Sequence, residues 1–328
     1  MCDRILWGMR TNEAPIVVAL GGNAVSREGE EGNIPQQFAN SRETAVRLVK
    51  LVSQGHHIVV THGNGPQVGN VLRRVELASK ELYPLPLDSC GADTQGAMGY
   101  MIGQCLNNEF RRCGIDKLAT AIVTTVEVDR DDPAFANPTK PIGRFYPADE
   151  AQKLKERQGW HMIEIRGHGF RRVVPSPLPR RIVEIDLIRR LVAEGQILIV
   201  AGGGGIPVTR NADGDYAGCE AVIDKDRTSA ILAREVDAAT LVIATSVERV
   251  ALDYDTPQVR YLDRMTIAEA RRYLDAGQFP PGSMGPKIEA AVSFLETSKH
   301  ADARVVICDL NGMTEALAGK TGTRIERD

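Results

Sequence analysis

Short apolar runs that lead directly into glycine recur along this chain. Three of them cover residues 16–20, 57–61 and 197–201. A continuous apolar run bounded by turn residues is typical of a strand that is buried on both faces. Such strands belong to parallel sheets, whose two faces are covered by helices. The pattern therefore predicts an α/β protein with a mainly parallel central sheet.

Between these strands the apolar spacing changes to that of helices. The first helix is predicted to start at Ser41 as its cap and to end at Gly55, with one buried face formed by Ala45, Leu48, Val49 and Val52. Right-handed crossovers return all parallel strand ends to one edge of the sheet. We therefore expect the three glycine-rich strand ends to converge. Further strands are predicted at residues 119–126, 240–245 and 304–308, the last being the final strand, and further helices at residues 87–114, 184–195, 227–236 and 288–297.

Residues 127–179 depart from this alternation. They are rich in proline and charge and contain one short helical segment, residues 148–158. We interpret them as a small subdomain or lid that protrudes from the sheet. Within it, Lys140 lies between Pro138 and Pro141, so its backbone is stiff and its ammonium can be delivered to a fixed place. The alternative is an ordinary surface lysine.

Composition narrows the class of protein. The 328 residues carry a net charge of −3, without a basic stripe for nucleic acid. No apolar run reaches membrane-spanning length, and the first residues lack a secretory signal. The six cysteines show no CxxC spacing and are interpreted as reduced thiols. We expect a cytoplasmic protein that binds neither nucleic acid nor a membrane.

Several common site motifs are absent or incomplete. The glycines after residue 20 do not match the dinucleotide fingerprint, and Gly319-Lys320-Thr321 lacks the earlier glycine and the flanking strand of a phosphate-binding loop. The chain has no HExxH zinc motif and no GxSxG elbow. Zinc chemistry and covalent catalysis are therefore not expected.

The remaining candidates are cations next to glycine-rich turns. Lys225 and Asp226 follow the residue 202–205 glycines by twenty positions, and Lys287 opens a helix, where the dipole disfavours a cation. A lysine in that place suits an anion bound by the same helix end. Phosphoryl transfer needs cations, backbone donors and positioning more than covalent help. We therefore predict a phosphate-handling site that binds a nucleotide together with Mg²⁺.

Seven segments together resemble one enzyme group. IVVALGGNA, THGNGPQVGN, NPTKPIG, VVPSP, AGGGGIPV, AVIDKD and GSMGPKIEAA are similar to the carbamate kinases, a group within the amino acid kinase family. The resemblance extends from about residue 16 to the predicted final strand. It implies an open three-layer αβα sandwich that works as a homodimer. The implied reaction is carbamate + ATP ⇌ carbamoyl phosphate + ADP, used in arginine metabolism.

The resemblance also implies roles for individual residues. Lys140, Lys225 and Lys287 would contact phosphate oxygens, and Asp226 would hold two of these lysines in place. The acceptor and the transferred group would be lined by Gly21, Gly22, Asn23, Gly63, Asn64 and Gly65. Independently of the resemblance, the residues themselves predict phosphate binding by the backbone N–H groups of Gly202, Gly203, Gly204 and Gly205, because residues without a Cβ allow close approach to an anion. The nucleotide site would also include Thr245, Ser246, Val247, Met284 and Gly285. No residue is assigned as a direct metal ligand.

The expected organisation is a single domain, residues 15–328, after an extension of residues 1–14. Its acceptor-binding part would cover about residues 15–208, with the lid at about 127–179, and its nucleotide-binding part about 209–328. Two alternatives stay open. One is a related kinase with another small carboxylate or phosphate acceptor. The other is a nucleotide-binding regulator without catalysis, which predicts a missing lysine or aspartate, and none is missing.

Overall fold

The central sheet dominates the computed structural model, which describes residues 14–27, 29–280 and 282–328. Residues 1–13, nearly all of the expected N-terminal extension, lie outside the described ranges. Across the sheet the strands follow the order β15 (Arg264–Thr266), β17 (Thr323–Glu326), β16 (Arg304–Asp309), β12 (Thr240–Thr245), β1 (Ile16–Leu20), β2 (Ile58–His62), β9 (Ile197–Ile199) and β3 (Ala119–Ala121). Neighbours pair in parallel, except that β16 and β17 are antiparallel.

Side chains of β1 alternate between two separate cores. Val17 and Ala19 belong to the core on one face, and Ile16, Val18 and Leu20 belong to the core on the other face. This alternation follows from the two-residue period of a strand. Because both faces of β1 are apolar, helices must cover both, which explains why the hydrophobic run is continuous rather than alternating.

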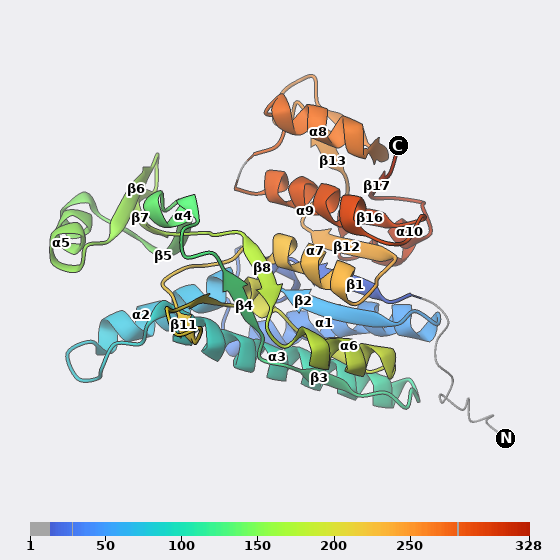
Figure 1. Ribbon diagram of the computed structural model, residues 1–328, viewed down its shortest axis with the longest axis horizontal. Coiled ribbons are helices and arrows are strands. Elements are labelled where there is room, and N and C mark those ends of the chain that lie inside the picture. The colour runs from blue at the N-terminus through green and yellow to red at the C-terminus, as the bar shows by residue number, and fades with distance from the viewer. Residues whose placement is uncertain (1–13, 28, 281) are drawn as a thin grey trace.

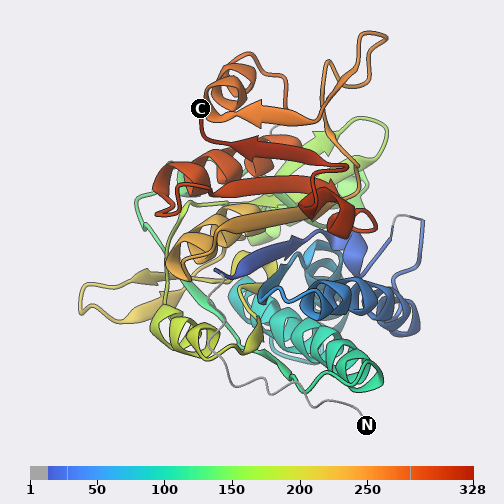
Figure 2. The same ribbon diagram turned by 90° about the vertical axis from the view of Figure 1, so that its right-hand side faces the viewer.

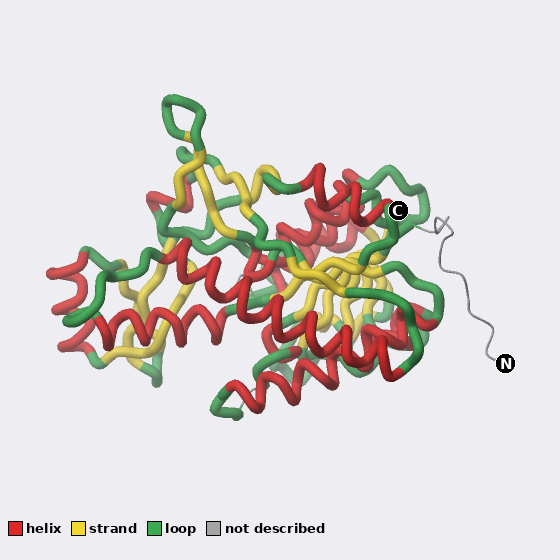
Figure 3. Tube along the Cα trace, turned by 90° about the horizontal axis from the view of Figure 1, so that it is seen from below, coloured by secondary structure: helices red, strands yellow, loops and turns green. Residues whose placement is uncertain are grey.

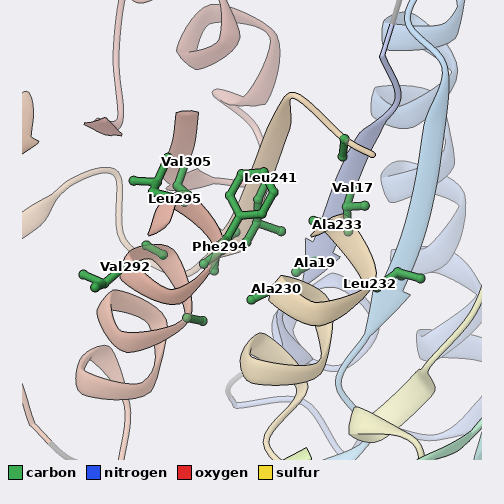
Figure 4. Packing of buried hydrophobic residues seen from close by; sticks show 14 of the residues in the cluster. Val17, Ala19, Ala230, Leu232, Ala233, Leu241, Val292, Phe294, Leu295 and Val305 are labelled. Atoms are coloured by element: carbon green, nitrogen blue, oxygen red, sulfur yellow. The ribbon is translucent and has the colours of Figure 1, made fainter. Parts of the chain in front are cut away.

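Helices form the two outer layers (Figures 2 and 3). The first layer packs on the Val17 face and contains α6 (Ile185–Ala193), α7 (Lys225–Glu235), α8 (Ile267–Asp275) and α9 (Met284–Thr297). The second layer packs on the Val18 face and contains α1 (Ile34–Ser53), α3 (Leu87–Arg112) and α10 (Met313–Leu317). Figure 4 shows Ala230 and Ala233 of α7 next to Val17 and Ala19 of β1. The fold is thus the expected three-layer αβα sandwich.

A smaller unit protrudes from one end of the sandwich (Figure 1). It contains a three-stranded antiparallel sheet and two helices, β5 (Lys140–Tyr146), β7 (Gly169–Val174), β6 (His161–Ile165), α4 (Pro133–Ala136) and α5 (Ala148–Gln158). Its base is a second sheet of four strands, β11 (Tyr216–Gly218), β10 (Ile206–Arg210), β4 (Thr125–Val128) and β8 (Pro179–Ile182). The protruding unit also packs on α2 (Gly65–Ala78), where the Tyr146 hydroxyl donates to Glu76 Oε1, 2.5 Å away. The remaining strands, β13 (Val250–Leu252) and β14 (Arg260–Leu262), form a hairpin.

Three sequence predictions about elements are wrong. Helix α1 begins at Ile34 rather than after Ser41, because Asn33 and Gln36 form a complete capping box and a proline occupies the first turn. Residues 119–126 form two strands in different sheets. The break is held by Gln95, whose side-chain oxygen accepts from the Thr124 N–H at 2.8 Å. Residues 304–308 are not the final strand, because β17 follows and returns antiparallel to β16.

Other predictions are confirmed in detail. Strands β1 and β12 and helix α5 have the expected bounds. Helix α8 begins with a capping box formed by Thr266 and Glu269. The methionines of α3, Met98 and Met101, are buried in the core. Within the described ranges, none of the helices combines the length and apolar character needed to span a bilayer.

Candidate active site

The glycine-rich strand ends meet at one edge of the sheet, as predicted. Strands β1, β2 and β9 are adjacent and parallel, so their carboxyl ends lie side by side. The Gly63 N–H donates to the Leu20 carbonyl at 3.0 Å. The Asn64 side chain lies where a Cβ on Gly203 would be, 2.3 Å from that position. The convergence therefore rests on direct contacts between all three loops.

Two lysines share one buried carboxylate above these loops. Asp226 lies in the first turn of α7, where Asp224 caps the helix. The Oδ1 atom of Asp226 accepts from Lys225, and the Oδ2 atom of Asp226 accepts from Nζ of Lys287 in α9 at 3.1 Å. The Asp226 side chain is only 3 % exposed, and those of Lys225 and Lys287 are 13 % and 16 % exposed. Two ammonium groups are thus fixed side by side against the strand ends.

The charge of this carboxylate is set by its two partners. Burial alone would raise the pKa of Asp226, but the charges and hydrogen bonds of Lys225 and Lys287 outweigh burial and hold that pKa below its usual range. A carboxylate with a lowered pKa is a weak base. Asp226 therefore suits the orientation of two lysines better than the acceptance of a proton.

The lid lysine approaches the same helix end. Lys140 is the first residue of β5, and its Nζ lies 3.1 Å from Asp224 Oδ2. Asp224 is the residue directly before Lys225, so the three predicted lysines all lie near the N-terminus of α7. That end also carries the positive end of the helix dipole, which favours anions.

The four glycines after β9 are packed tightly rather than loosely looped. Gly203, Gly204 and Gly205 all have positive φ angles, of 65°, 92° and 93°. Two of the N–H groups are used inside the turn, since Gly204 donates to Ala201 and Gly205 donates to Gly202. A Cβ on Gly204 would lie 2.4 Å from the Ile223 carbonyl oxygen. Glycine is therefore required here for the close approach of the turn to the segment that begins α7.

Two adjoining cavities open on the lysines. One cavity of about 730 Å³ is lined by Thr245, Ser246, Val247, Met284 and Lys287 together with Arg249, Tyr254 and Tyr261. A second of about 580 Å³ is lined by Gly21, Gly22, Lys225 and Lys287, with Thr245 and Ser246 shared between the two. Their sizes fall in the range of small-molecule sites.

The remaining predicted residues are placed less directly. Gly65 is the first residue of α2, and Gly285 lies in α9, where a Cβ would be 3.1 Å from the Pro280 carbonyl oxygen. Asn23 lies in the short turn η1 (Gly22–Ala24), and its side chain is outside what the structure describes.

His62 lies beneath the site as a buried neutral base. Its Nδ1–H donates to the Gly63 carbonyl at 3.1 Å, and a Cβ on Gly202 would lie 2.4 Å from Nε2. Burial, together with the charge of Lys225, lowers the pKa of His62 to about 4, although the bond to Gly63 acts in the opposite direction. The imidazole is therefore a fixed spacer between two glycine loops.

This burial predicts a pH-dependent contribution of His62 to stability. Below the unfolded-state pKa of about 6.5, the unfolded chain takes up a proton that the folded state refuses, so stability falls as the pH drops from about 6.5 toward 4. The loss should be about 2 kcal/mol at pH 5. Urea unfolding at pH 7.5 and 5.0 should give a smaller difference for His62→Gln than for the unchanged protein.

The matched control for this measurement is His161→Gln, since His161 is exposed on the lid strand β6. That variant should keep the full difference between the two pH values. Equal pH dependence in the unchanged protein and His62→Gln would show that the buried imidazole does not carry the effect.

Two residues that organise the site were missed in the sequence. Asp224 holds Lys140 and caps α7, and His62 is packed between two glycine loops. Asp-Lys-Asp at a helix start was a usable signal for a cap. The partner of Asp224 is 84 residues away in sequence, so local spacing could not reveal it.

Comparisons with known proteins agree with this geometry. The model of the amino acid kinase family matches residues 14–309. A carbamate kinase of Thermococcus kodakarensis is 45% identical, over 95% of this chain and 99% of that protein. The carbamate kinase-like protein YahI of Escherichia coli is 48% identical, over 94% and 98%. The solved structure of a Giardia lamblia carbamate kinase bound to AMP-PNP superposes with a TM-score of 0.91 at 37% identity, covering 97% of this chain and 100% of that one. The chain belongs to the amino acid kinase family.

Proposed function

We propose that this chain is a carbamate kinase, an ATP-dependent phosphotransferase that interconverts carbamoyl phosphate and ADP with carbamate and ATP. The observation that carries the proposal is the Lys225–Asp226–Lys287 cluster at the edge of two adjoining cavities. The chain aligns with nearly the whole length of relatives named carbamate kinase, which supports the choice of reaction.

The proposed role of the lysines is electrostatic. In phosphoryl transfer the moving group carries negative charge on its equatorial oxygens, and here the acceptor is an anion as well. Lys225 and Lys287 would neutralise that charge, with Lys140 reaching in from the lid. Asp226 holds the first two at fixed positions, so little reorganisation is needed during the reaction.

The nucleotide would occupy the cavity lined by Thr245, Ser246, Val247 and Met284, with Gly285 behind it in α9. The acceptor would lie by Gly21, Gly22, Asn23, Gly63, Asn64 and Gly65, next to Lys225. The run Gly202, Gly203, Gly204 and Gly205 would bring the phosphate end of the site close to α7. In this assignment the lid at about residues 127–179 covers the acceptor side.

Mg²⁺ is proposed to enter with the nucleotide. In kinase sites this ion is bound largely through substrate phosphates. Asp226 is already bonded through both oxygens to lysines, so the chain's own contribution fits phosphate binding rather than a metal cage. Bound there, the ion would add positive charge to the transferred group. Among the described residues no group of three or more His, Cys, Asp or Glu side chains is placed to hold a metal.

A second candidate is a related kinase with another small carboxylate or phosphate acceptor. It is favoured by Arg27 and Arg47, which line the same cavity as Gly22 and could bind an additional anionic group. Both guanidinium groups lie near Glu43, at 2.5 Å and 3.9 Å, which reduces their free charge.

One assay tests the proposal. Purified protein with MgADP and carbamoyl phosphate should produce ATP, measured by luminescence. A panel of other acyl phosphates as donors separates the second candidate from the first. The proposal also includes a homodimer, which light scattering measures directly. Absence of ATP at micromolar enzyme with carbamoyl phosphate, but formation with another donor, would transfer the proposal to the second candidate, and absence with all donors would contradict both.

A further inference from the structure

Asp224 bonds to two different parts of the site at once. Its Oδ1 accepts from the Asp226 N–H at 3.0 Å, which caps α7. Its Oδ2 lies 3.1 Å from Nζ of Lys140, the first residue of the lid strand β5. One carboxylate therefore joins the lid to the helix that carries Lys225 and Asp226.

The backbone around Asp224 is held by the glycine turn. A Cβ on Gly204 would lie 2.4 Å from the Ile223 oxygen and 3.2 Å from the Asp224 carbonyl carbon. Thr228 of α7 closes the same contact, since its hydroxyl donates to the Gly204 carbonyl at 2.8 Å. The Asp224 side chain is 14 % exposed. The carboxylate thus has a fixed position relative to the sheet.

Lys140, in contrast, has a fixed backbone and a loosely held side chain. Its backbone pairs with Val174 of β7. The side chain is 33 % exposed, and a lysine ammonium on a four-carbon stem loses considerable rotamer freedom when it is fixed. Within the described part of the chain, the Asp224 carboxylate is the group that bonds this ammonium to the site.

We propose that Asp224 is a positioning residue for the reaction. Its carboxylate fixes the ammonium of Lys140 relative to α7 and thereby sets the position of the lid over the phosphates. This inference rests on the proposed function, in which Lys140 contacts the transferred group. Asp224 touches no substrate in this role. It acts through Lys140, and its influence should disappear when Lys140 is removed.

Asp224→Asn is the informative change. Asparagine keeps an oxygen that can cap α7 but loses the charge that attracts Lys140. We expect kcat to fall about ten- to a hundredfold, as for other small misplacements of reacting groups. The KM for ADP should change less than about threefold, because Lys140 lies on the lid side of the transferred group. If Asp224→Asn fails to fold, Asp224→Ser replaces it, since serine also caps helices.

The lid itself offers a matched control. Asp129 also accepts the N–H two residues ahead with Oδ1, at 3.0 Å, and pairs with a cation, Arg180, through Oδ2. Asp129→Asn therefore removes an ion pair with a similar local bond, but this pair joins the end of β4 to β8 in the base sheet and does not touch α7. It should leave kcat unchanged. An equal loss in both variants would mean that lid ion pairs matter in general, and would overturn the specific role of Asp224.

A double-variant cycle separates action through Lys140 from any other action. In a Lys140→Met background, Asp224→Asn should lower kcat no further. If the two losses multiply, Asp224 acts through the α7 cap or through Lys225, and the proposal is wrong.

A readout without substrate keeps this test separate from the proposed function. Amide hydrogen exchange of the segment Lys140–Tyr146 should be faster in Asp224→Asn than in Asp129→Asn or the unchanged protein, because the lid has lost its attachment. If no variant makes ATP but this difference is present, the reaction has been assigned wrongly while the attachment stands. If ATP forms normally in Asp224→Asn and exchange is unchanged, the positioning role is refuted.

Discussion

Replacing Lys225 by methionine should reduce turnover by about a hundred- to a thousandfold, the usual effect of removing one charge-stabilising donor from a site. The side chain of Lys225 is 13 % exposed and lies against the strand ends, with its terminal carbons 3.6 Å from the position of a Cβ on Gly63. Methionine keeps most of that packing. The KM for ADP should change much less than kcat, because the lost charge acts on the group in transfer.

The melting temperature should change by only a few degrees, since about 1 kcal/mol corresponds to roughly 2–4 °C in a chain of this size. Asp226 keeps its bond to Lys287 at 3.1 Å, so the buried charge is not left alone. Lys50→Met is the control, because Lys50 pairs with Glu315 at 3.7 Å on the exposed side of α1. A large loss of stability with activity retained in Lys225→Met would show that the ion pair is structural.

The central sheet could be predicted because most of its strands are indicated by a local apolar pattern in the sequence. Ile16–Leu20 and Thr240–Thr245 have the expected bounds, since the first is apolar throughout, the second is apolar between its two threonines, and each is followed by small or polar residues. β17 could not be found in this way. It is four residues long and alternates buried and exposed positions with arginine and glutamate, so its place depends on pairing with β16.

Start signals of helices were predictable only where the whole cap was considered. Ser41 is a good capping residue by type, but it is buried inside α1. The capping box at Asn33 and a proline in the first turn define an earlier start. In α7 the cap Asp224 places the helix start at Lys225, two residues earlier than the apolar spacing indicates.

The candidate site shows the same division. Parallel topology brings the glycine-rich strand ends together, and this follows from the handedness of crossovers alone. The meeting of Lys140 with Asp224, or of Lys287 with Asp226, depends on tertiary distances between residues 84 and 61 positions apart. Spacing along the sequence cannot reveal contacts between such distant residues. The residue types therefore indicated which lysines belong to the site, but not where each one lies.

The close contact of the glycine turn with α7 leads to the second large prediction. Gly204→Ala should lower the free energy of unfolding by about 3 kcal/mol or more, because a positive φ costs a non-glycine residue about 1–3 kcal/mol and the new methyl also meets backbone. Its Cβ would lie 2.4 Å from the Ile223 oxygen. Relief of that clash must displace the segment leading into Lys225 and Asp226, so turnover should fall as well, by about a hundredfold for a displacement of about 1 Å.

Gly214→Ala separates the two causes. Gly214 has nearly the same φ, 87° against 92°, but a Cβ there would meet nothing within 4 Å. It lies in the turn between β10 and β11, so it carries the backbone penalty without the clash and should keep full turnover. Denaturant unfolding and initial rates of both variants provide the comparison. If the two alanine variants are equally stable and equally active, the glycine turn does not fix the position of α7. The lysine cluster must then be held in place by other contacts, such as the 2.7 Å hydrogen bond between the Thr61 and Ser229 hydroxyls.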